Sequence, residues 1–65
     1  MTTTLTVEGM SCGNCEATVV EALEGVDGVT SATADNETDS ATVEGDADPL
    51  DLVLAVNEAG YDAQA

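Results

Sequence analysis

The sequence contains no Lys, Arg or His to balance its 14 Asp and Glu residues, which gives a formal net charge of −14. Nucleic-acid binding is therefore not expected, because it requires cationic side chains that displace counterions from phosphates. Attraction to an anionic membrane surface is excluded for the same reason. The lack of His also removes the commonest general base and the commonest nitrogen ligand for metals.

Long apolar runs are missing as well. The longest is the five residues from Leu52 to Val56, whereas a membrane-spanning helix needs about 20. No basic segment followed by an apolar stretch comes after Met1, so a secretory signal is not predicted. We expect a single cytoplasmic domain over residues 1–65, without membrane insertion.

Large apolar side chains are scarce, because the chain has no Ile, Phe or Trp and relies on ten Ala and eight Val. A domain of this size rarely gains more than about 3 to 5 kcal/mol from its core, and repulsion among the acids opposes folding. The acids are nevertheless spread between periodic apolar positions, which favours a folded domain over a disordered one. Because about 1 M salt shortens the Debye length to about 3 Å, we expect a halophilic protein in a high-salt cytoplasm.

Two apolar periodicities alternate along the chain, and turn residues separate them. The alternating pattern predicts strands over 2–8 and 29–35, a strand around Ala41 and Val43 after a turn over 36–38, and a final strand over 61–65. Helical spacing predicts one helix that starts at Cys15, with Glu16 away from its apolar side, and whose end is bracketed by Gly25 and Gly28. It predicts a second helix that Asp48 caps and that ends near Ala59. The order βαββαβ predicts an α+β, ferredoxin-like fold: a four-stranded antiparallel sheet with two helices on one face.

The second predicted helix has more apolar residues than one core-facing stripe needs. The apolar side that best fits the core leaves Leu50 and Leu54, four residues apart, partly exposed. Its residues are Leu52, Val53, Val56 and Ala59. We favour the interpretation that a small core uses more of the helix, and a docking patch is the alternative.

Both cysteines lie in one short segment between the first strand and the first helix, Gly9-Met10-Ser11-Cys12-Gly13-Asn14-Cys15. With Cys12 in the loop and Cys15 in the first helical turn, both sulfurs can converge on one point. The helix N-terminus stabilises a thiolate, and Ser11 and Asn14 are candidate N-caps. Soft thiolates prefer soft ions, above all Cu(I), whereas Zn(II) would need further ligands.

This segment resembles the G-M-x-C-x-x-C signature of the heavy-metal-associated domain, which occurs in cytoplasmic copper chaperones and in copper-transporting P-type ATPases. The resemblance extends to Asp27-Gly28-Val29 after the first helix and to Ala59-Gly60-Tyr61-Asp62 after the second. It implies that Cys12 and Cys15 bind one Cu(I) as a near-linear dithiolate.

The resemblance also implies supporting roles for the residues around the cysteines. Gly9, Met10 and Ser11 would shape the loop, with Met10 buried beneath it, and Tyr61 would approach the metal from the turn before the last strand. The implied function is that of a carrier, not an enzyme. It would pass Cu(I) by ligand exchange to a P-type ATPase metal-binding domain, a copper sensor or another copper-accepting protein. We expect a monomer, with a metal-bridged dimer as the alternative.

Two other functions stay open at this point. The same fold could bind Zn(II), Cd(II) or Hg(II), with Glu8 or Glu16 as a third ligand, or Cys12 and Cys15 could act as a thiol–disulfide oxidoreductase. A closed structural zinc site is disfavoured, because it takes four protein ligands and the chain has two cysteines and no His. The missing Lys and Arg also depart from the basic docking patches that copper chaperones often use.

Overall fold

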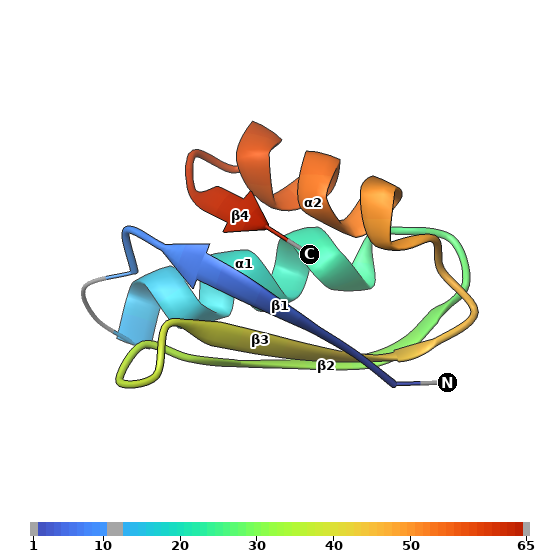
Figure 1. Ribbon diagram of the computed structural model, residues 1–65, viewed down its shortest axis with the longest axis horizontal. Coiled ribbons are helices and arrows are strands. Elements are labelled where there is room, and N and C mark those ends of the chain that lie inside the picture. The colour runs from blue at the N-terminus through green and yellow to red at the C-terminus, as the bar shows by residue number, and fades with distance from the viewer. Residues whose placement is uncertain (1, 11–12, 65) are drawn as a thin grey trace.

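The structure is a computed structural model that describes residues 2–10 and 13–64, in which two helices cover one face of a sheet (Figure 1). Its elements are β1 (Thr2–Glu8), α1 (Gly13–Glu24), β2 (Val29–Asp35), β3 (Ser40–Gly45), α2 (Pro49–Glu58) and β4 (Asp62–Gln64). All paired strands are antiparallel, in the order β2-β3-β1-β4. This is the predicted ferredoxin-like α+β fold. No helix in the described ranges is long and apolar enough to cross a membrane.

The core lies between the helices and the sheet, and small side chains fill most of it. On β1, Leu5 and Val7 are fully buried while the residues between and beside them are exposed, as strand alternation requires. The other face of the sheet carries hydroxyl and acidic side chains such as Thr4, Thr33 and Glu44. The buried apolar residues are Leu5, Val7, Met10, Val19, Leu23, Ala32, Ala41, Val43, Leu52, Val56 and Ala63.

Helix α2 begins as the sequence predicts. The carboxylate of Asp48 accepts a hydrogen bond from the backbone N–H of Leu50 at 3.0 Å, and Pro49 opens the helix where no N–H partner is needed. The buried side of the helix contains Leu52 and Val56, whereas Leu50 and Leu54 are 69% and 59% exposed. The leucine pair therefore lies outside the core.

Two glycines bring two backbone segments into close contact where β2 begins and β3 ends. Gly45 has φ +133°, and a Cβ at this position would collide with the carbonyl oxygen of Gly28. That same oxygen accepts a hydrogen bond from the backbone N–H of Asp46 at 2.9 Å. Only glycine fits this approach of two backbones without a local shift.

Helix α1 begins earlier than predicted. Its first residue is Gly13, so Asn14 lies inside the helix and the prediction that it caps the helix is wrong. The backbone carbonyl of Asn14 instead accepts a hydrogen bond from the hydroxyl of Thr18 at 3.0 Å. Apolar periodicity starts only at Cys15, and it carries no information about the exposed residues that precede it. Ser11, the other predicted cap, lies outside the described residues.

Two further boundaries also differ from the prediction. The turn between β2 and β3 extends to Asp39, one residue past its predicted end, and Asp39 adopts a left-handed backbone with φ 53°. Tyr61 precedes β4 instead of starting it, because its backbone N–H donates to the carbonyl of Val56 at 3.2 Å and closes the end of α2.

Candidate metal site

The segment with the cysteine pair follows β1 and leads into α1 in the sequence, and Figure 1 shows the end of β1 and the start of α1 at the same end of the molecule. Its strand side is fixed by the core, because the side chain of Met10 is only 6% exposed and belongs to the buried cluster. Gly9, just before it, has φ +100°, a conformation that favours glycine. The buried Met10 thus anchors the chain as it leaves the sheet.

The helix side of the segment contains Cys15. This residue lies in the first turn of α1, is half-buried, and packs against the core. Gly13 and Asn14 before it are exposed. The prediction for Cys12 falls outside the described residues, so the convergence of the two sulfurs stays a prediction.

Tyr61 lies in the turn between α2 and β4 and is half-buried. Its ring borders the start of the cysteine segment, since a Cβ on Gly9 would lie 3.6 Å from the Cδ1 atom of Tyr61. The adjacent residue Asp62 pairs with Glu8 across the β1–β4 ladder. The fold therefore brings Tyr61 beside the segment, and its contribution to metal binding stays a prediction.

The sequence suggests Glu16 as a possible metal ligand but gives no sign of the hydrogen bond that this side chain makes in the structure. Glu16 follows Cys15 directly, and its Oε2 atom accepts a hydrogen bond from the backbone N–H of Asn36 at 2.7 Å. Glu16 is half-buried, although the helical pattern predicts that it faces away from the core. No local signal connects two residues that are 20 positions apart, so only the tertiary structure reveals this bond.

The turn that supplies Asn36 also contacts the strand side of the segment. The carbonyl oxygen of Asp39 accepts a hydrogen bond from the backbone N–H of Val7 at 2.8 Å. Within residues 2–10 and 13–64, no group of three Cys, His, Asp or Glu side chains is placed to hold a metal ion.

A family model described as the heavy-metal-associated domain matches residues 4–62. The chain belongs to the heavy-metal-associated domain family. Copper chaperone CopZ of Staphylococcus aureus is 41% identical over 61 residues, an alignment that covers 89% of this chain and 90% of the relative.

Solved structures of heavy-metal-associated domains superimpose closely on this one. A CopZ metallochaperone has a TM-score of 0.93 at 37% identity, covering 98% of this chain and 100% of that one. The N-terminal domain of a potential copper-translocating P-type ATPase from Bacillus subtilis, solved in the Cu(I)-loaded state, has a TM-score of 0.88 at 29% identity, covering 97% and 82%. The structural similarity thus covers nearly the whole chain, as the family match does.

Proposed function

We propose that this chain is a metal chaperone that carries Cu(I) between Cys12 and Cys15. The observation that supports it most directly is the family match across residues 4–62, together with a relative named as a copper chaperone at 41% identity. The position of Cys15 in the first turn of a helix adds a physical reason. Unpaired N–H groups and the positive end of the helix dipole favour a thiolate there, although the chain has no cationic side chain that would also stabilise it.

The proposed mechanism is ligand exchange without a redox step. A Cu(I) held by two sulfurs accepts a third thiolate from the partner, and one Cu–S bond to this chain then breaks. The partner's thiol loses its proton as it binds, the released cysteine takes one up, and copper stays Cu(I) throughout. Loading replaces two thiol protons with one Cu(I), so it releases protons and weakens as pH falls.

A Cu(I) titration under reducing conditions, against a competing chelator, tests this proposal. We expect one Cu(I) per chain, loss of binding in the Cys12→Ser, Cys15→Ser double variant, and full binding in Asn14→Ser. The last variant is a matched control, because it changes an exposed residue between the cysteines and leaves both thiols in place. Unchanged binding in the double variant would exclude these cysteines as the metal site.

Two further assays on the same protein distinguish copper transport from the alternative functions, zinc binding and thiol–disulfide exchange. Zn(II) with a carboxylate ligand is less well supported, because the Oε2 atom of Glu16 already accepts the N–H of Asn36. A Zn(II) affinity that equals the Cu(I) affinity, and that falls in Glu8→Gln, would favour that alternative. An oxidoreductase would turn over insulin disulfides, and we expect no turnover.

The proposed partner is a copper-accepting domain, such as the metal-binding domain of a copper-transporting P-type ATPase, in a high-salt cytoplasm. With no Lys or Arg, this chain offers no basic docking patch, so docking would rest on shape, on apolar contact around the half-buried Tyr61, and on the shared metal. Met10 is only 6% exposed and offers a partner almost no surface. If the partner is equally acidic, salt reduces the repulsion between them. We expect this chain to be a monomer with a single domain over residues 1–65, and we expect its complex with the partner to be transient. The affinity of that complex should rise with KCl. A steep fall would imply a basic partner.

A further inference from the structure

Glu16 differs from every other acidic residue of the chain. All 14 acids lie among the described residues; 13 are exposed, and Glu16 alone is half-buried. Its bond to Asn36 is short, at 2.7 Å, and it links α1 to the turn between β2 and β3. A short hydrogen bond to an ionised acceptor in a partly buried place is stronger than one on an open surface.

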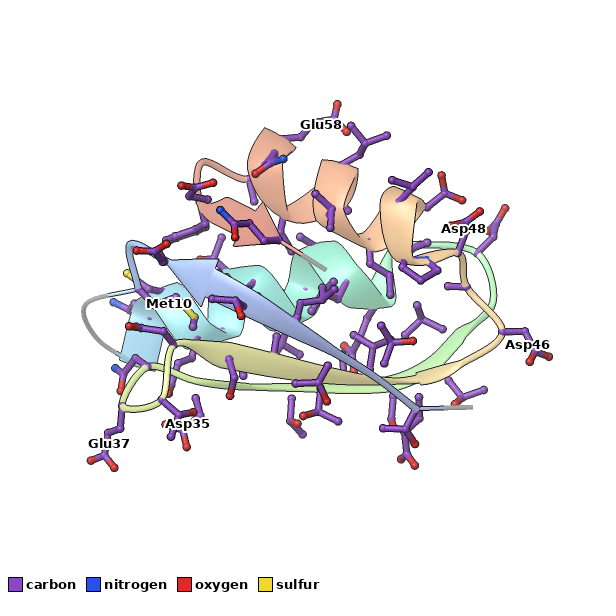
Figure 2. The ribbon with its side chains drawn as sticks, viewed as in Figure 1. Met10, Asp35, Glu37, Asp46, Asp48 and Glu58 are labelled. Atoms are coloured by element: carbon purple, nitrogen blue, oxygen red, sulfur yellow. The ribbon has the colours of Figure 1, made fainter. Side chains whose placement is uncertain are left out.

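The same turn holds both sides of the cysteine segment. Asp39 accepts the N–H of Val7, two residues before Gly9, while Asn36 donates to Glu16 on α1. The turn itself is fixed by Asp35, whose Oδ1 atom accepts the N–H of Glu37 at 2.9 Å. In Figure 2, Asp35 and Glu37 lie at the same end of the molecule as Met10. Two separate bonds therefore connect this turn to the strand and to the helix that flank the segment.

We propose that turn 36–39 braces the start of α1 and that Glu16 is a positioning residue, which holds the first turn of α1 and hence Cys15 in place. The proposal rests on the proposed function, because it takes Cys15 as a metal ligand. What the bond needs at position 16 is an acceptor oxygen at this distance. A Gln side chain carries such an oxygen on a chain of the same length, so the amide should replace the carboxylate.

Three variants test the role of Glu16. Glu16→Ala removes the acceptor, and Glu16→Gln keeps it without the charge. Asp48→Ala is the control for stability, because it removes the bond to Leu50 that caps α2 at the end of the molecule opposite Met10 (Figure 2). Cu(I) affinity is measured for each by chelator competition, at a temperature where circular dichroism shows a folded protein.

We expect Glu16→Ala to bind Cu(I) about tenfold more weakly, at the low end of what residues supporting a metal ligand contribute. Glu16→Gln should bind within about twofold of the parent chain, because its amide oxygen accepts the same N–H. Asp48→Ala should lower the melting temperature and leave the affinity unchanged. Protection of the Asn36 amide from hydrogen exchange should be lost in Glu16→Ala and kept in Glu16→Gln.

Other results would overturn the proposal. Parental affinity in Glu16→Ala would show that the brace does not position Cys15. An equal loss in Glu16→Gln would indicate that the charge or direct coordination matters, and an equal loss in Asp48→Ala would indicate a general effect of stability. If the parent chain binds no Cu(I), the proposed function fails instead. Amide exchange on the metal-free variants then decides whether Glu16 holds the turn, and an unprotected Asn36 in the parent chain rules the brace out.

Discussion

A cross-strand pair of like charges offers a local test of the high-salt hypothesis. Glu8 on β1 stands directly opposite Asp62 on β4, and both residues are exposed. In the described ladders it is the one position where two carboxylates face each other. The substitution Asp62→Asn removes the repulsion while keeping the size and polarity of the side chain, so we expect it to stabilise the fold at low salt.

The expected gain follows from the position of the pair in the sheet. A favourable cross-strand pair contributes about 0.2–1 kcal/mol, and like charges directly opposite are destabilising, so we expect this pair to cost a similar amount. For a domain of this size, a change of 1 kcal/mol moves the melting temperature by about 4–8 °C. Asp62→Asn should therefore raise it by about 1–8 °C in about 0.1 M KCl, where the Debye length is about 10 Å. In about 1 M KCl, where that length is about 3 Å, the gain should disappear.

The assay is thermal unfolding followed by circular dichroism at both salt concentrations. A double-mutant cycle with Glu8→Gln isolates the pairwise interaction from the effect of each substitution alone. Asp46→Asn is the matched control, because it removes the charge of one exposed acid that has no carboxylate opposite it in the sheet. An equal gain in Asp46→Asn would show that the melting temperature depends on net charge alone, and not on the Glu8–Asp62 pair. A gain for Asp62→Asn that persists in concentrated KCl would contradict the electrostatic reasoning.

Three further predictions concern the core, the glycine contact and loading. Leu52→Ala should cost about 2–5 kcal/mol because Leu52 is fully buried, whereas the exposed Leu54→Ser should change stability by less than about 0.5 kcal/mol; urea unfolding of both distinguishes a core residue from a surface one. Gly45→Ala should destabilise the fold by more than about 1 kcal/mol, since its Cβ would collide with the Gly28 carbonyl, and a parental urea midpoint would contradict this contact. Cu(I) affinity should fall as pH is lowered, because the thiols must lose protons, and a flat profile in chelator competition would argue against thiolate ligation.

Sequence reasoning succeeded where a local pattern reports burial directly. Alternation over 2–8 and 29–35 matches β1 and β2, and the pair Asp48-Pro49 marks the start of α2 because capping depends on neighbouring residues only. The order of these elements then leaves few topologies for a chain of 65 residues. The ferredoxin-like sheet was therefore predictable without any tertiary information.

The failures share a different physical origin. The start of α1 at Gly13 was missed because exposed residues at a helix end contribute nothing to apolar periodicity. The bond between Glu16 and Asn36 was missed because it depends on how α1 packs against the sheet, which no spacing in the sequence encodes. The cysteine pair was easy to find from its spacing, whereas the contacts that hold its flanks come from distant parts of the chain.

Salt separates the two ways in which acids act in this protein. The charges of the 13 exposed carboxylates repel one another through solvent, so the benefit of removing one, as in Asp62→Asn, should decline as KCl screens the charge. Glu16 acts through a hydrogen bond of 2.7 Å in a half-buried place, where screening is much weaker. The loss of Cu(I) affinity in Glu16→Ala should therefore be the same in about 0.1 M and about 1 M KCl. If the difference in affinity between Glu16→Ala and the parent chain disappears in about 1 M KCl, Glu16 acts through its charge, as the other 13 acids do.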